Sequence, residues 1–380
     1  MNTFRDDVDF LARHTDVIVL DAHRPALAAV APCLQGRVMT STPAGETAPG
    51  LGWINRDFIA SGRRGTPFDN YGGEDRFWLG PEGGQFALWF KKGQPFDLAR
   101  WRTPEGLNAG EFVVTSQGGA SVALAANFEV TNYAGTTFSV AVRRVVDVLS
   151  CDEVADHLGF SRRKGVQCVA VQTTNTLANV GSRPWTREGG LLSVWTLGQF
   201  KPLPHGWVIV PFIPGAKEDL GPLPNGGYFG KMPPERFIVR DGCALFRCDG
   251  EFRSKLGVSP RRARRVLGSY DPEGRMLTVV QFNLPAGAAG LPYVNSLWEI
   301  SDQPFAGDVV NSYNDGPAEP GAASLGGFYE IETSSPAAEL EPEEAITHVH
   351  RTFHFTGNGK ALNDLSKSVL GVDLGELPGV

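Results

Sequence analysis

The stretch Thr137–Leu149, TFSVAVRRVVDVL, alternates apolar and polar side chains along most of its length. Because successive side chains of a strand point to opposite faces, this pattern is typical of a half-buried β-strand. The same period, with many β-branched and aromatic residues, recurs along the chain. The further runs are Gln85–Phe90, Val122–Thr131, Gly206–Phe212, Arg236–Arg240, Met276–Leu284, Gly327–Glu332 and His348–Phe355. The sequence therefore predicts a β protein.

Helical patterns are few. They cover Thr3–Arg13, Asp152–Leu158 behind a Ser150 cap, and a tail around Ala361–Leu370. The 46 glycines and 27 prolines are scattered, so we interpret them as turns between many short strands. No repeat of fixed period is visible, which disfavours a propeller or a solenoid.

These patterns favour an all-β fold built from two facing sheets, with alternate residues buried between them. We expect a single domain over residues 1–380, a large antiparallel β-sandwich with few short helices. Its N-terminal segment (about 1–15) is helical, and a C-terminal tail covers about 358–380. In a sandwich this large, a concave sheet face is the expected place for a ligand.

The net charge of −7 argues against a nucleic-acid partner and against an anionic membrane surface. One basic cluster, Arg261–Arg265, could bind a polyanion, but we interpret it as a solvated turn. The sequence has no Walker loop, HExxH, GxSxG, or GxGxxG followed by a helix, so it lacks the motifs of nucleotide, zincin, hydrolase-elbow and dinucleotide sites.

The five cysteines are an odd number without CxxC spacing, so we expect reduced, mostly buried thiols. The N-terminus MNTFRDDVDFLARHTD has acidic residues where a signal peptide needs a positive end and an apolar stretch. No apolar window approaches the roughly 18 residues of a membrane span. We therefore expect a cytoplasmic protein without a membrane partner. Nothing indicates the oligomeric state.

The segment Tyr71–Phe86, YGGEDRFWLGPEGGQF, concentrates charges and aromatic rings among glycines, and it follows Asn55-Arg56. Arginine and carboxylate groups bind sugar hydroxyls through paired hydrogen bonds, and a tryptophan face packs on the apolar side of a pyranose. Glycines allow the backbone to approach a ligand closely. The alternative is a surface salt-bridge network with a core tryptophan. The candidates here are Asn55, Arg56, Glu74, Asp75, Arg76, Trp78 and Glu82.

The run Gly327–Pro336, GFYEIETSSP, puts Glu330 and Glu332 on the same face of a predicted strand. Two neighbouring carboxylates raise the pKa of one of them, which suits general acid or base catalysis near neutral pH. On a solvent-facing surface the pair would have no such role. The apolar neighbours Phe328 and Ile331 favour partial burial, and hence a function for one glutamate.

Other turns mix aromatic rings with amides or charges more often than turn formation requires. Their candidate ligand-binding residues are Lys231, Arg253, Trp298, Asn314 and Asp315. His348, His350 and His354 alternate along one strand, as metal ligands can, but no cysteine or carboxylate completes a ligand pattern. We therefore expect no metal and no cofactor, and we keep His350 as a substrate-binding candidate.

The late motifs Tyr329–Ser334, Pro336-Ala-Ala, Leu340–Glu344 and His350–Phe355 resemble the C-terminal part of aldose 1-epimerases (galactose mutarotases). By this resemblance Glu332 occupies the position of the general base. Asn55-Arg56 is similar to an Asn-Arg pair that binds substrate, and Tyr71-Gly-Gly73 to a His-Gly-Gly turn. Thr174–Asn179 resembles their Thr-Asn-His segment. Other segments are closer to an uncharacterised bacterial family of the galactose-mutarotase-like superfamily.

Two departures from the epimerase pattern concern the chemistry. Thr176 stands where the acid histidine is expected, and Tyr71 replaces the histidine before the Gly-Gly pair. The resemblance implies a sugar-active enzyme with Glu332 as base and a mono- or oligosaccharide as substrate. Glu74, Asp75, Arg76 or a histidine from another strand could replace the missing acid, and Arg56, Asp75 and Arg76 are the expected hydroxyl-binding or charge-stabilising groups. Epimerisation, glycoside hydrolysis and lyase elimination all stay open. The alternatives are a non-catalytic carbohydrate-binding protein and a structural β-domain.

Overall fold

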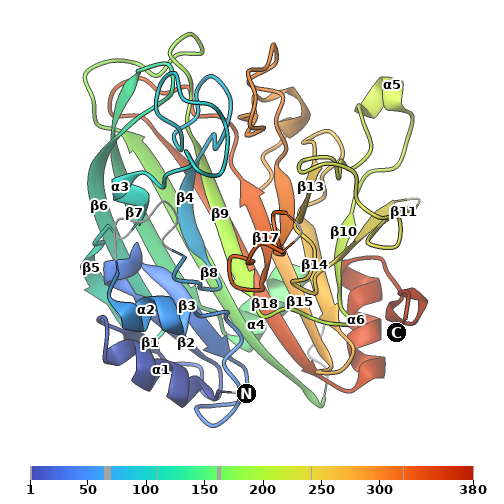
Figure 1. Ribbon diagram of the computed structural model, residues 1–380. Coiled ribbons are helices and arrows are strands. Elements are labelled where there is room, and N and C mark those ends of the chain that lie inside the picture. Colours follow the sequence, from blue (N-terminus) through green and yellow to red (C-terminus); the bar gives the residue numbers. More distant parts are fainter. Residues whose placement is uncertain are drawn as a thin grey trace.

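The computed structural model describes residues 2–63, 70–108, 110–160, 164–240, 242–319 and 321–379. In these ranges strands dominate and helices are short (Figure 1). The strands are β1 Ile18–Leu20, β2 Leu27–Ala31, β3 Arg37–Thr42, β4 Arg76–Gly80, β5 Val113–Gln117, β6 Ser121–Thr131, β7 Thr137–Val148, β8 Val166–Asn179, β9 Ser193–Phe200, β10 Trp207–Pro211, β11 Phe237–Arg240, β12 Cys243–Arg247, β13 Ser254–Val258, β14 Val266–Asp271, β15 Met276–Phe282, β16 Val310–Asn314, β17 Tyr329–Ser334 and β18 Ala345–Gly357. The helices are α1 Phe4–Ala12, α2 Arg56–Ser61, α3 Glu105–Asn108, α4 Cys151–Leu158, α5 Lys217–Leu220 and α6 Gly359–Val369, with 3₁₀ turns η1 Pro32–Leu34, η2 Ala288–Gly290 and η3 Leu374–Glu376.

The strands form three antiparallel sheets. A ten-stranded sheet has the order β11-β12-β10-β14-β15-β18-β8-β7-β6-β5, a five-stranded sheet has the order β13-β16-β17-β9-β4, and a small sheet has the order β1-β2-β3. The two larger sheets face each other (Figure 1), and hydrogen bonds cross between them, from Tyr329 to Ser269 and from Thr333 to His348. The predicted antiparallel β-sandwich is confirmed.

The alternation that predicted β7 is also its burial pattern. Its even-numbered residues, including Val140, Val142 and Val146, are buried in the core between the sheets, whereas the residues between them are more exposed. Burying a valine side chain contributes roughly 1.5–3 kcal/mol, so a register shift of one residue would exchange this stabilisation for exposed apolar surface. The hydrophobic pattern therefore fixes which face of the ten-stranded sheet is internal.

The three predicted helices are present as α1, α4 and α6. Thr3 and Ser150 each form a capping box at the start of α1 and α4, in which an acidic side chain three residues later bonds back to the cap. Leu362 and Leu365 of α6 pack in a cluster with Phe353 on the outer face of the ten-stranded sheet. None of the helices in the described ranges is long and apolar enough to cross a membrane.

The predicted strand Gln85–Phe90 is wrong. This segment is a loop held by turns, with Ala87 N–H donating to Gly84 O at 3.0 Å and Leu88 N–H to Pro81 O at 3.0 Å. Its apolar side chains are buried because Trp89 packs on Trp78, with ring centroids 4.2 Å apart. The spacing of apolar residues indicates which side chains are buried but not the secondary structure. In this segment the side chains are buried because a loop folds over a sheet.

Two expectations from composition also need correction. Arg262, in the predicted solvated turn, is fully buried, and its guanidinium donates to the carbonyls of Ile213, Gly215 and Gly221. The cysteine side chains are free in the structure, but only Cys243 and Cys248 of the five are buried.

The alternating histidines of β18 point into the sandwich. His348 and His350 both hydrogen-bond to the Thr333 hydroxyl, at 2.8 Å each. Burial lowers the pKa of His348 to about 3 and that of His350 to about 4. Among the described residues, no group of three histidine, cysteine or acidic side chains is placed to hold a metal ion.

These histidines predict an acid-dependent loss of stability. Below the ordinary histidine pKa of about 6.5 the unfolded chain binds protons that the folded protein excludes, so the free energy of unfolding falls as the pH drops from about 7 to 4. The expected loss is on the order of 2 kcal/mol per histidine at pH 5. Urea unfolding at pH 7 and pH 5 measures it, and the double variant H348Q/H350Q should lose less than the wild type. An equal loss in both proteins would contradict this origin.

Candidate functional site

The register of the five-stranded sheet brings charged residues together on the face turned away from the ten-stranded sheet. Glu332 lies opposite Leu197, which lies opposite Arg76 on β4. One row along, Lys255 lies opposite Tyr313, which lies opposite Glu330. Because directly paired residues of antiparallel strands share a face, side chains from all five strands converge there.

Arg76 and Glu330 form a buried ion pair on this face. The Arg76 guanidinium donates to Glu330 Oε1, and its Cζ lies 4.4 Å from the centroid of the Trp78 ring. Burial raises the pKa of Glu330 to about 7, because desolvation and the neighbouring Glu332 outweigh the charge of Arg76. A carboxyl with this pKa can exchange a proton near neutral pH.

Glu332 lies deeper and is fully buried. Its Oε2 accepts from Lys255 Nζ at 3.0 Å and from Trp195 Nε1 at 2.9 Å, while Oε1 has no hydrogen-bond partner among the described residues. Burial would lower the pKa of Lys255, but the carboxylates of Glu332 and Glu82 outweigh it and raise that pKa. The pair therefore holds a charged ammonium beside a carboxylate in an interior position.

A pocket of about 70 Å³ opens over these residues. Glu82 faces it from the loop after β4, and Trp101 Nε1 donates to Glu82 Oε1 at 2.9 Å. Burial raises the pKa of Glu82. The remaining lining includes Trp78, Leu98, Trp195, Leu197, Phe229, Arg253, Lys255, Trp298, Tyr313, Leu325, Phe328 and Glu330. Two carboxyl groups, two cations and four tryptophans thus line one pocket.

Glu74 and Asp75 point elsewhere. The Glu74 carboxylate accepts from Ser41 N at 2.5 Å and lies 3.3 Å from His354 Nε2, inside the sandwich. Asp75 is paired with the buried Arg144 of β7 and accepts from the Thr173 hydroxyl at 2.9 Å. Because side chains alternate along a strand, Asp75 and Arg76 face opposite sides of the sheet. Asp75 therefore joins the two sheets.

The sequence matches a family of unknown function (DUF6786) over residues 2–379. The chain belongs to this family. No curated protein matches the sequence. Among solved structures, the chain is similar to a candidate aldose 1-epimerase from Escherichia coli K12, at 11% identity and a TM-score of 0.52, with 90% of this chain and 99% of that chain covered.

Two further solved structures are similar over nearly their whole length. A protein from Synechocystis has 11% identity and a TM-score of 0.51, with 90% of this chain and 96% of that chain covered. A galactose mutarotase-like protein from Lactobacillus casei has 10% identity and a TM-score of 0.47, with coverage of 89% and 100%. The comparison depends on the two structures with TM-scores above 0.5, and identities this low show the fold alone. The DUF6786 chain therefore has the galactose-mutarotase-like fold, as the short motifs predicted.

In this DUF6786 member, Asn55 and Arg56 do not line the pocket. Asn55 caps α2 by accepting from Phe58 N–H at 3.1 Å. Arg56 donates to Asp7 Oδ1 at 2.5 Å and lies over the Phe10 ring, so it joins α2 to α1. The candidates Arg56 and Asp75 therefore lie apart from the candidates Arg76 and Glu332, which do come together.

Several candidates from the C-terminal half of the sequence also lie outside the pocket. His350 faces the interior, and Lys231 is exposed in the loop before β11. Asn314 accepts from Gly250 N–H at 2.9 Å on the inner face of the sheet. Asp315 accepts from the Tyr313 hydroxyl at 3.0 Å and so supports a pocket residue. Of the predicted binding residues, the pocket lining includes Trp78, Glu82, Arg253 and Trp298.

The Gly-Gly pair of the early segment has a structural role. Gly72 has φ of 86°, and a Cβ there would lie 2.1 Å from the Trp53 carbonyl oxygen. Only glycine fits such an approach without displacing the backbone. These contacts hold the turn before β4, and hence Arg76, against the segment Trp53-Ile54.

Sequence reasoning missed Lys255, Trp195 and Trp101. Lys255 and Trp195 lie on β13 and β9, whose pairing with β16 and β17 brings them beside Glu332. Neither β13 nor β9 was predicted, and β9 is buried at every position, so it lacks the alternation of polarity that marks a half-buried strand. Trp101 lies in a loop. A signal was available only for Lys255, as a charge within the apolar run Ser254–Val258.

Proposed function

We propose that this protein is a carbohydrate-active enzyme whose site is the pocket over Glu330 and Glu332. The observation that carries the proposal is the convergence of a Glu330–Arg76 pair, a Glu332–Lys255 pair and Glu82 beneath tryptophan rings, all on one sheet face. Carboxyl groups and cations bind sugar hydroxyls, and aromatic rings bind the apolar face of a sugar. The galactose-mutarotase-like fold adds an analogy, since fold alone does not define function.

The two glutamates suit different roles in proton transfer. Glu332 accepts two hydrogen bonds on one oxygen, and its other oxygen, buried beneath the pocket, has no partner among the described residues, so we assign it as the base. Glu330, with a pKa of about 7, is the acid. Two neighbouring carboxyl groups with different surroundings are typical of an acid–base pair. Thr176 cannot supply the acid, because its hydroxyl contacts Thr347 on the outer face of the ten-stranded sheet.

The pocket volume limits how a sugar could bind. At about 70 Å³ it has room for about two water molecules, each of which takes about 30 Å³ of the liquid. A sugar ring would therefore enter this pocket only in part unless its lining residues moved apart. Epimerisation, glycoside cleavage and elimination are all compatible with such an acid–base pair.

The test is a screen of mono- and oligosaccharides against the purified full-length protein. NMR spectra follow the exchange of anomeric forms and the appearance of products, and thermal unfolding follows binding. A sugar that raises the unfolding temperature and is converted supports the proposal. The absence of binding and of conversion across the panel would argue against it.

The pKa of Glu330 predicts the pH dependence of turnover. If Glu330 acts as the protonated acid, turnover falls as the pH rises above about 7, by about tenfold per pH unit once the group is ionised. An ordinary glutamic acid would lose its proton near pH 4.5. Rates measured between pH 5 and 9 check this, and E330Q should lack the fall. A fall retained in E330Q would assign it to another group.

A second candidate function is carbohydrate binding without catalysis. The four tryptophans that line the pocket, Trp78, Trp101, Trp195 and Trp298, favour it, because such rings serve binding without any proton transfer. Under this alternative a sugar raises the unfolding temperature but is recovered unchanged. The response of binding to E330Q and E332Q would then be small.

A further inference from the structure

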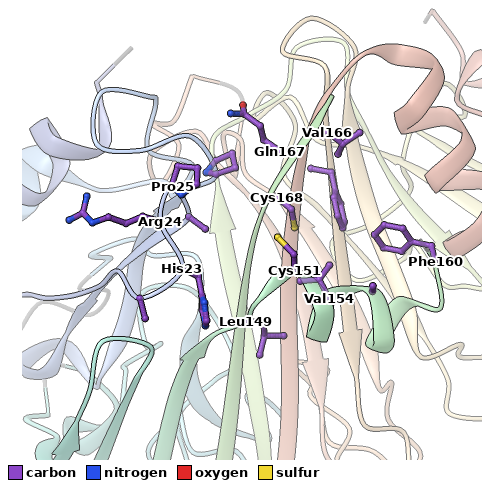
Figure 2. Close-up of a pocket in the computed structure, with 15 residues that line it drawn as sticks. His23, Arg24, Pro25, Leu149, Cys151, Val154, Phe160, Val166, Gln167 and Cys168 are labelled. Carbon is purple, nitrogen blue, oxygen red and sulfur yellow. The ribbon is translucent and has the colours of Figure 1, made fainter. Parts of the chain in front are cut away.

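A second pocket, of about 580 Å³, lies on the outer face of the ten-stranded sheet, and Figure 2 shows its lining. Its walls come from the segment between β1 and β2, from α4 and from β8. It shares no lining residue with the pocket over Glu330. Two of the five cysteines, Cys151 and Cys168, line it together.

Strand register brings these two cysteines opposite each other. Strands β7 and β8 pair up to Val148 with Val171, and Leu149 N–H still donates to Ala170 O at 2.9 Å. Ser150 remains extended, with φ of −68° and ψ of 163°, before α4 begins. The same register, continued two residues, places Cys151 opposite Cys168, and the Cys151 thiol is close enough to raise the pKa of Cys168.

This position suits a cross-link. Directly opposite residues share a face of the sheet, as Asp147 and Gln172 do a few residues away, with a hydrogen bond of 3.4 Å. Hydrogen-bonded pairs of this kind have Cα atoms about 5.5 Å apart, within the range of about 4.4–6.8 Å that disulfides adopt. In Figure 2 the sulfur atoms of Cys151 and Cys168 point toward one another.

The two thiols differ in accessibility. Cys151 is exposed at the first turn of α4, whereas Cys168 on β8 is only partly exposed, and desolvation raises its pKa. A reagent therefore meets Cys151 first. The surroundings of the other three cysteines differ. Cys243 and Cys248 are buried, and the Cys33 thiol lies beside the Asp16 carboxylate.

We propose that Cys151 and Cys168 form a redox-active dithiol, with Cys151 as the attacking and Cys168 as the resolving thiol, and that small-molecule disulfides such as oxidised glutathione are its oxidants. The Cys151 thiolate attacks one sulfur of the disulfide, forms a mixed disulfide and releases one thiolate. The Cys168 thiolate then attacks the Cys151 sulfur, forms the Cys151–Cys168 bond and releases the second thiolate. Two protein thiols are oxidised, one disulfide is reduced to two thiols, and their two protons pass to the released thiolates.

The experiment treats the reduced full-length protein with excess oxidised glutathione and then alkylates the remaining thiols. Intact mass and a non-reducing peptide map give the products. The wild type should lose two hydrogen atoms, carry no glutathione and yield one linked peptide containing Cys151 and Cys168. C168S should retain one glutathione on Cys151 for at least about ten times longer than the wild type. C33S, which removes a thiol outside the pocket, should behave as the wild type.

Three outcomes would overturn the proposal. They are a stable mixed disulfide in the wild type, a link to any other cysteine, and no reaction at either thiol. All three outcomes are read from the masses of the wild-type protein, so the test does not depend on whether a variant folds. The second step should also speed up by about tenfold per pH unit between pH 7 and 9, because only the Cys168 thiolate attacks. A flat pH dependence would exclude Cys168 as the resolving group.

Discussion

Glu332→Gln is expected to lower sugar turnover by about a hundredfold or more while the protein stays folded. Glutamine keeps the shape of the side chain but cannot take a proton, and it leaves the Lys255 ammonium without its carboxylate partner. Sugar binding should change much less than turnover, because Glu330, Glu82 and the tryptophans of the pocket remain. Turnover by NMR and binding by thermal shift, measured on the same sugar, separate the two effects.

The matched control for this variant is Glu339→Gln. Glu339 is a glutamate seven residues away with about half of its side chain exposed, paired with Arg187 at the surface. It should keep both turnover and stability. Sugar conversion that persists in Glu332→Gln at the wild-type rate would remove Glu332 from the mechanism, and Glu330→Gln would then test the other carboxyl group of the pair.

Arg144→Met is expected to lower the free energy of unfolding by about 3–5 kcal/mol, the typical result of breaking a buried ion pair. Arg144 is fully buried, pairs with Asp75, and donates to Gly36 O at 2.9 Å and to Asn175 Oδ1 at 2.6 Å. Methionine fills much of the space but leaves the Asp75 carboxylate in the interior without a cation. The loss is therefore mainly the cost of an uncompensated buried charge.

Urea unfolding at neutral pH measures this loss. Arg143→Met is the matched control, because Arg143 is the preceding residue of β7 and is exposed, so its removal should change stability by no more than about 0.5 kcal/mol. The double variant Arg144→Met/Asp75→Asn should recover part of the stability, since asparagine carries no charge. Equal stabilities of the Arg144 and Arg143 variants would show that the Asp75–Arg144 pair does not hold the two sheets together.

The sequence located half of the candidate site. Glu330 and Glu332 could be placed on one face because two residues is the period of a strand, and this spacing is local. Trp78, Glu82, Arg253 and Trp298 came from composition at turns, and these four line the pocket. The same reasoning placed Asp75 beside Arg76, although adjacent side chains of a strand point to opposite faces.

The sequence alone determined the class of fold, because alternation along Thr137–Leu149 is imposed by burial on one side of a sheet. It did not determine the internal face of β18, where the polar His348 and His350 face the interior and Phe353 packs on the outer face. Only the tertiary structure decided which partners each charge meets. Lys255 joins Glu332, and Arg144 joins Asp75, through pairings between strands or sheets far apart in the chain. Such partners depend on strand order and register, which are set by the packing of the whole sandwich and leave no local trace in either segment.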